Sequence, residues 1–176
     1  MSALVIYESM WGNTRDVAEA VAQGIGPEVP VIEVGEAPSP LPADVDLLVL
    51  GGPTHAFTMS RPATRRDAVQ KGAPPGHEDR GIREWLEAQE GRDSVDVATF
   101  DTRVAKVRRL PGSAAKAAAR VARQHHLGRL VDTESFYVED MEGPLIDGEL
   151  ERARDWGASV LSRHGGLPPG EPAGGR

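Results

Sequence analysis

The sequence predicts one α/β domain in which helices cover both faces of a five-stranded parallel sheet, giving a doubly wound, three-layer arrangement. The first observation is that short apolar runs of strand length alternate with segments whose apolar residues recur at helical spacing. The second is that the runs at residues 3–7 and 46–52 are apolar almost throughout, which is typical of strands buried on both faces. Because 39% of the 176 residues are hydrophobic, the chain can form one good core, so we expect one domain.

The first half of the chain is predicted to contain three strands and one helix. Residues 3–7 form the first strand, residues 29–34 the second, with Pro30 at its start or on an edge, and residues 46–52 the third. Three prolines make residues 37–42 a loop. The helix after the first strand has an apolar face made of Val17, Ala18, Val21, Ala22 and Ile25.

Residues 59–80 are predicted to be a long loop, since they include Pro62, Pro74 and Pro75. The segment also carries five basic residues, Arg61, Arg65, Arg66, Lys71 and Arg80. Loops of this length inside a compact domain are usually functional or disordered. The segment is therefore a lid, a docking arm for a partner, or a mobile connection.

The second half of the chain is predicted to contain two strands and three helices. A helix runs from Ile82 and ends at Gly91, and the fourth strand covers residues 94–100. Ser113 caps an Ala-rich helix over residues 114–124. The fifth strand lies within residues 130–138 and is interrupted near Asp132.

The last predicted helix spans residues 147–163 and closes the domain, which we place at residues 1–163. Its inward residues are Leu150, Ala153, Trp156, Val160 and Leu161. Glycine and proline dominate residues 164–176, so we expect a disordered tail there.

The segment between the first strand and the first helix is the clearest candidate for a ligand site. It is small and polar, with Ser9, Gly12, Asn13 and Thr14. Backbone N–H groups at a helix start have no partner within the helix, and the helix dipole adds positive charge there. Several N–H groups aimed at one point hold a phosphate without any lysine. A turn that binds nothing is the alternative, but a plain connection needs fewer polar residues.

The six residues Ser9-Met10-Trp11-Gly12-Asn13-Thr14 resemble the phosphate-binding loop of the flavodoxin family, whose usual form is T/S-x-T-G-N-T. Ser9, Gly12, Asn13 and Thr14 fit that form, whereas Trp11 replaces a hydroxyl residue. The resemblance covers residues 3–163 and is to the short-chain type, because the fifth strand has no room for the insertion of long-chain members. It implies the flavodoxin-like strand order 2-1-3-4-5, which makes the carboxyl ends of the first, third and fourth strands neighbours.

The resemblance also implies bound FMN and two further loops that contact its ring. The second loop follows the pattern G-x-P-T and contains Pro53, Thr54, His55, Ala56 and Phe57. The third loop contains Phe100, Asp101, Thr102 and Arg103. The phosphate would lie at residues 9–14, and the isoalloxazine between the other two loops.

Aromatic stacking in the third loop is where the sequence departs from the family. Flavodoxins usually stack an aromatic residue of that loop on the flavin, but no Tyr or Trp occurs between residues 100 and 122. Trp11, His55 or Phe57 would then supply the ring, although Met10 and Trp11 are also candidates for the core.

The third loop is also basic, whereas the family usually has an acidic rim. We expect its four basic residues to stabilise the anionic reduced flavin and raise its potential. These residues are Arg103, Lys106, Arg108 and Arg109.

Composition excludes several classes of function. A net charge of −7 argues against nucleic acid as a partner, because a phosphate backbone requires a cationic face. The absence of cysteine excludes disulfides, thiolate metal sites and a cysteine nucleophile. No apolar run is long enough to span a membrane, and residues 1–2 lead directly into the first strand, so we expect a cytoplasmic protein that is a monomer or homodimer.

We predict no metal site and no catalytic side chain. The adjacent His125 and His126 point about 100° apart on a helix and cannot easily share one ion. Ser113 and Lys116 match S-x-x-K, but the S-D-N and K-T-G motifs of penicillin-recognising enzymes do not follow. The hydrolase motif G-x-S-x-G and the phosphate loop G-x-x-x-x-G-K-[ST] are both absent.

The predicted function is electron transfer between a reductase and an electron acceptor, with FMN carrying one or two electrons. Two alternatives remain open. One is an FMN-dependent reductase of quinones or similar acceptors, in which the arginines of residues 59–80 hold NAD(P)H. The other is a flavodoxin-like module that has lost its cofactor and binds a protein partner.

Overall fold

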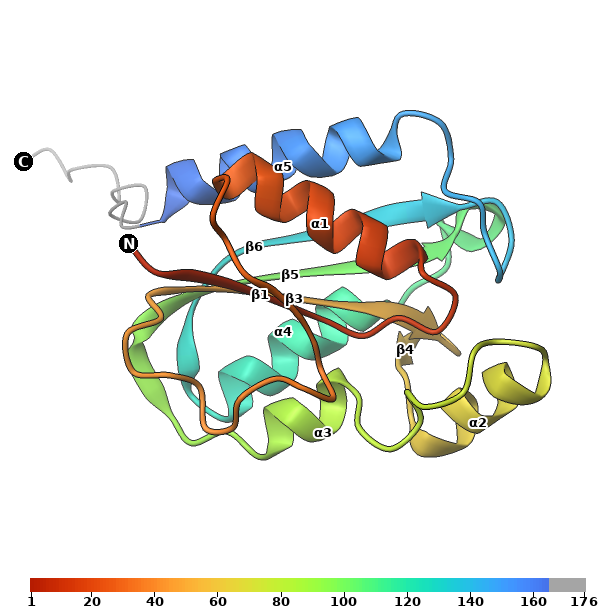
Figure 1. The fold of residues 1–176 in the computed structure, drawn as a ribbon, viewed down its shortest axis with the longest axis horizontal. Coiled ribbons are helices and arrows are strands. Elements are labelled where there is room, and N and C mark those ends of the chain that lie inside the picture. Colours follow the sequence, from red (N-terminus) through yellow and green to blue (C-terminus); the bar gives the residue numbers. More distant parts are fainter. Residues whose placement is uncertain (165–176) are drawn as a thin grey trace, which may run out of the picture.

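Residues 1–164, the part of the chain that the computed structural model describes, form a parallel sheet between two layers of helices (Figure 1). The strands are β1 (Ala3–Tyr7), β2 (Val31–Glu33), β3 (Leu47–His55), β4 (Thr58–Met59), β5 (Arg92–Val104) and β6 (Leu127–Val138). The helices are α1 (Asn13–Ile25), α2 (Pro62–Gln70), α3 (Ile82–Glu87), the 3-10 helix η1 (Ala105–Val107), α4 (Ala114–Gln124) and α5 (Glu149–Arg163).

Five parallel strands lie in the order β2-β1-β3-β5-β6. This is the predicted order 2-1-3-4-5, counted over the parallel strands alone, so the predicted topology is confirmed. The short β4 adds a sixth strand that was not predicted; it pairs antiparallel with the end of β3, with Thr54 opposite Met59 and His55 opposite Thr58.

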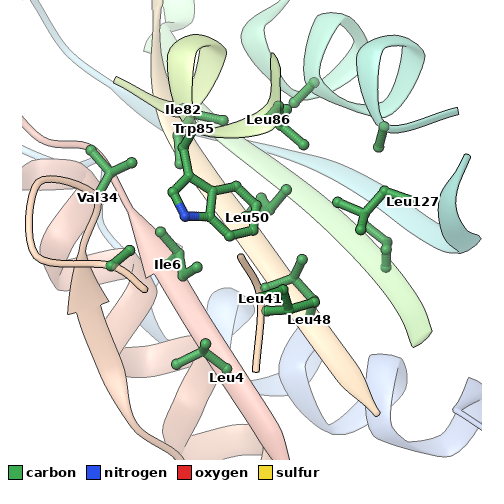
Figure 2. Close-up of a cluster of buried hydrophobic side chains, with 14 of the residues drawn as sticks. Leu4, Ile6, Val34, Leu41, Leu48, Leu50, Ile82, Trp85, Leu86 and Leu127 are labelled. Carbon is green, nitrogen blue, oxygen red and sulfur yellow. The ribbon is translucent and has the colours of Figure 1, made fainter. Parts of the chain in front are cut away.

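Side chains of the central strands alternate between two cores, one on each face of the sheet. Leu4 and Ile6 of β1 face the layer of α3 and α4, where they pack with Leu48, Leu50 and the fully buried Trp85 (Figure 2). The intervening residues of the same strands face α1 and α5, among them Val5, Val49 and Phe100. Both faces of the sheet are therefore buried under helices, which explains why β1 and β3 are apolar almost throughout.

Helices α1 and α5 pack closely because a glycine of each lies against the other helix backbone. A Cβ on Gly24 would overlap the Arg154 carbonyl oxygen, and a Cβ on Gly157 would overlap the Val21 carbonyl oxygen. The face of α5 that packs this way contains Ala153, Trp156 and Val160 as predicted, but Leu150 is 43% exposed and was wrongly placed inside.

Several predicted boundaries are wrong by a few residues. The segment 59–80, predicted as a loop throughout, contains α2, with Pro62 as its first residue. The helix predicted to end at Gly91 ends at Glu87, and β5 begins two residues before the predicted strand and extends four beyond it. Strand β6 begins at Leu127 and skips Val131 in its register with β5, close to the interruption predicted at Asp132.

The predicted tail can be assessed only at its first residue. His164 Nδ1 lies 2.9 Å from a carboxylate oxygen of Asp96, so this residue is attached to the sheet. The rest of the predicted tail, 165–176, lies outside the described residues. Within residues 1–164 no helix is long and apolar enough to cross a membrane.

Candidate functional site

The loop between β1 and α1 has the geometry expected of an anion-binding helix start. Gly12 precedes the first residue of α1 and takes φ 95°, a left-handed conformation that glycine adopts without strain. Within residues 1–164, the backbone N–H groups of Met10, Trp11, Asn13 and Thr14 donate to no other protein group. These N–H groups are available to a ligand at the end of the helix where the dipole favours negative charge.

Some polar groups of this loop are already engaged within the protein. The Gly12 N–H donates to Ser9 Oγ at 3.0 Å, and Asn13 Nδ2 donates to the Glu142 carbonyl at 3.1 Å. The hydroxyl oxygens of Thr14 and Thr102 lie 2.7 Å apart. Because a hydroxyl both accepts and donates, Ser9 and one of the two threonines still have a hydrogen to offer an anion.

The second predicted loop is the β3–β4 hairpin. Ala56 and Phe57 occupy its turn with φ values of 47° and 63°, a two-residue turn for which Asn-Gly is the usual sequence. Thr54 and His55 line the cavity described below, although the Thr54 hydroxyl also accepts a hydrogen bond of 2.8 Å from the Ala114 N–H at the start of α4. Phe57 points elsewhere: it is 46% exposed and is not a lining residue of that cavity.

The third predicted loop is not a loop. Residues 100–103 all lie within β5. Residues 100–102 pair with β3, and residues 100–103 pair with β6. Phe100 is in the core, edge-to-face with Phe136 and Trp156 at centroid distances of 6.0 and 6.1 Å. Asp101 is fully buried, accepts a hydrogen bond from the Ala115 N–H, and has its pKa raised by burial. Neither residue lines the cavity.

Helix α2 forms a wall of the site that sequence reasoning missed. Thr64, Asp67 and Ala68 line the cavity from this helix. One signal was present in the sequence, because Pro62 occupies the first position of α2, where proline is favoured in helices. The remaining lining residues that were not predicted come from the ends of β5 and β6 and the loop after β6: Val104, Val138 and Met141.

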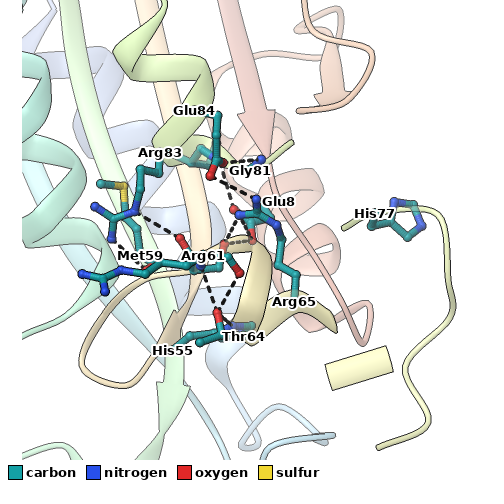
Figure 3. Close-up of polar contacts among 12 residues, drawn as sticks. Glu8, His55, Met59, Arg61, Thr64, Arg65, His77, Gly81, Arg83 and Glu84 are labelled. Carbon is teal, nitrogen blue, oxygen red and sulfur yellow. Dashed lines mark hydrogen bonds and ion pairs between the residues drawn. The ribbon is translucent and has the colours of Figure 1, made fainter. Parts of the chain in front are cut away.

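A buried polar network fastens α2 to the end of β1 (Figure 3). Glu8 directly follows β1, and one of its carboxylate oxygens accepts from the Ile82 N–H at 2.9 Å while the other bonds the Ser60 hydroxyl. The fully buried Arg65 of α2 donates to Ser60 Oγ at 2.8 Å and pairs with Glu84 at 3.1 Å. Burial raises the pKa of Glu8, and the hydrogen bonds together with Arg65 oppose that shift.

His55 contributes a neutral imidazole to the cavity at neutral pH. Its Nδ1 lies 3.0 Å from the Thr64 hydroxyl of α2. Burial, and secondarily the positive charge of Arg65, lower the pKa of His55 from 6.5 to about 4. The ring is therefore an uncharged planar group in the wall of the cavity.

Arg103 is the one cationic side chain that lines the cavity among the described residues. It is 6% exposed, and its Nη2 donates to the carbonyl oxygens of Val107 and Leu110 at 2.9 and 3.1 Å. Its Nε is buried and has no hydrogen-bond partner within residues 1–164. A buried guanidinium nitrogen without a partner is costly, which marks it as a group that an acceptor would satisfy.

These elements enclose a cavity of about 260 Å³ at the carboxyl ends of β1, β3 and β5. It combines free N–H groups at a helix start, apolar walls from Met10, Trp11 and Val104, and a buried cation. In open α/β sheets this edge is where ligands bind. The donor set fits a planar, partly apolar ligand that ends in an anionic group.

Comparison with solved structures shows which known proteins share this fold. The chain matches solved structures of a flavodoxin from the domain Archaea (18% identity, TM-score 0.59, covering 93% of this chain and 98% of that one) and of Flavodoxin 2 from Bacillus cereus (19%, 0.62, 93% and 99%). It also matches a flavodoxin, WrbA-like protein from Agrobacterium tumefaciens (22%, 0.52, 92% and 95%).

The chain has the flavodoxin-like fold. The predicted resemblance is thus confirmed at the level of fold, over nearly the whole chain. No protein-family model matches the sequence, and no curated protein does.

Proposed function

We propose that this flavodoxin-like chain binds FMN in the cavity and transfers electrons. One observation carries the proposal: four backbone N–H groups at the start of α1, beside a cavity with apolar walls, have no partner within residues 1–164. They belong to Met10, Trp11, Asn13 and Thr14. FMN is a planar ring joined to a terminal phosphate, so it needs both features at once. The flavodoxin-like fold supports the same choice of ligand.

The chain's own residues have separable tasks in this proposal. The N–H groups and the Ser9 hydroxyl hold the phosphate, while Trp11 and His55, which line the cavity, flank the ring. Arg103 supplies positive charge within the cavity, and the α2 wall excludes water. FMN when bound supplies the redox chemistry, accepting one or two electrons. We assign no side chain the role of an acid or base.

Absorbance spectroscopy of the pure protein, with and without added FMN, tests the proposal. We expect FMN to bind with one-to-one stoichiometry, and we expect quenching of its fluorescence. A protein that stays colourless and leaves FMN fluorescence unchanged would refute FMN binding and favour a module that binds only protein.

A second assay separates a carrier from an enzyme. We expect the FMN-loaded protein to oxidise NAD(P)H slowly unless a reductase is added. Steady oxidation of NAD(P)H by the protein alone, with a quinone as acceptor, would refute the carrier and establish the reductase.

A further inference from the structure

Next to the cavity the protein carries an exposed surface that the site itself does not use. It consists of Phe57 at the hairpin turn together with residues 106–110, and we call it the basic lip. Lys106, Arg108 and Arg109 are exposed, and the two apolar members, Phe57 and Leu110, are 46% and 47% exposed. Two large apolar side chains beside three cations are a composition typical of a docking surface.

The basic lip is held in place by the cavity wall. Arg103 donates to the carbonyl oxygens of Val107 and Leu110, so the same side chain lines the cavity and fixes the lip. Gly112 (φ 90°) passes against the hairpin turn, where a Cβ would lie 2.6 Å from the Phe57 oxygen. Phe57 and residues 106–110 are therefore one preorganised surface, which lowers the entropic cost of docking.

The charge of the basic lip is opposite to that of the whole molecule. Within residues 1–164, the side chains of Lys106, Arg108 and Arg109 form no ion pair or hydrogen bond. Arg152, by contrast, pairs with Glu149. Asp67 of α2 lines the cavity, and further acidic groups lie in the loop after β6, which Met141 joins to the cavity wall, at Glu139, Asp140 and Glu142.

We propose that the basic lip is the docking surface for an acidic redox protein, the partner that exchanges electrons with the site. The inference rests on the proposed function. Unpaired cations on an acidic molecule (net charge −7) orient an acidic partner toward the cavity, and Phe57 with Leu110 supplies the apolar contact once it has arrived.

The first test uses ferricyanide, an anionic oxidant, as the probe of the local charge. The FMN-loaded protein is reduced and mixed with ferricyanide over a range of ionic strength. We expect the rate constant to fall as salt rises, although the net charge of −7 alone predicts the opposite slope. A rate that rises with salt would overturn the proposal.

Two variants of equal charge separate the basic lip from the net charge. Arg108→Glu/Arg109→Glu and the control Arg120→Glu/Arg123→Glu both change the net charge from −7 to −11, that is by two reversals of two units each. The control residues are exposed on α4, toward the other end of the sheet. We expect the first variant to lose about tenfold in rate at low salt, and the control to lose less than about twofold. Equal losses would overturn the proposal.

A second test does not depend on FMN. We add poly-L-glutamate to the isotopically labelled protein and follow backbone amide shifts by NMR. We expect the shifted amides to be those of Phe57 and residues 106–110, and we expect Leu110→Ser to weaken the effect. Shifts centred elsewhere would overturn the docking surface, whereas failure of the FMN titration would refute only the proposed function.

Discussion

Replacing His55 by Gln should make the protein less sensitive to acid. His55 has a pKa of about 4 in the folded protein, against 6.5 when unperturbed. Between these two values the unfolded chain binds a proton at this position and the folded protein does not. Stability is therefore lost as the pH falls from 6.5 towards 4, and this loss disappears when the imidazole is removed.

The size of the effect follows from the two pKa values. At pH 5 the unfolded histidine is almost fully protonated and the folded one is mostly neutral, which costs about 2 kcal/mol of unfolding free energy relative to high pH. At pH 7.5 the same contribution is close to zero. The side chain is only partly exposed and its Nδ1 bonds Thr64, so Gln keeps a polar group near that hydroxyl.

Urea unfolding of the apoprotein at pH 7.5 and pH 5 measures this contribution. We expect the loss of stability between the two pH values to be about 2 kcal/mol smaller in His55→Gln than in the wild type. His126→Asn is the matched control, because His126 is exposed, lies at the opposite end of the sheet and has φ 52°, which Asn tolerates. An unchanged pH dependence in His55→Gln would show that the imidazole is not held neutral by its surroundings.

Three further changes test the site and its supports. Asn13→Asp should weaken FMN binding about tenfold, because it places a carboxylate beside the phosphate; equal affinity by fluorescence quenching would count against the phosphate position. Arg103→Gln should lower the FMN midpoint potential by on the order of 50 mV, since it removes the positive charge in the cavity; spectroelectrochemistry showing an unchanged or higher value would exclude that role. Ala56→Gly should raise the unfolding free energy by about 1 kcal/mol by relieving the left-handed backbone, and a decrease in urea unfolding would contradict it.

The sheet was predictable because its signals are local and repeated. Strands β1 and β3 are apolar on both faces, and their register places Leu4 beside Leu48 and Val5 beside Val49, as two dry cores require. The hairpin that adds β4 could not be predicted, because Ala56 and Phe57 have no preference for a left-handed turn. Tertiary packing against Gly112 accompanies this turn and leaves no local pattern in the sequence.

The third candidate segment is predicted as a loop because the resemblance places one there, and its polar residues give no sign that the strand continues. Asp101 and Thr102 are polar, yet both are buried in β5. Asp101 lies under the start of α4, where its carboxylate accepts from the Ala115 N–H, and Thr102 reaches Thr14 of the first loop. Their polar groups form hydrogen bonds between the sheet and the helices that cover it. The strand itself continues to Val104, and Arg103 of this strand lines the cavity.

The segment 59–80 shows why charge alone does not predict exposure. Its length and prolines predicted a lid, a docking arm or a mobile connection that carries several cations, but Arg65 is fully buried, and its charge is matched by Glu84 and Glu8. A buried ion pair is expensive to break because the remaining charge is left without a partner. The α2 wall is thus attached to the residue that follows β1, and the loop of residues 9–14 begins at the next position. Any change at Glu8 or Arg65 should therefore disturb the loop and the wall together, which makes the shape of the cavity depend on residues that do not line it.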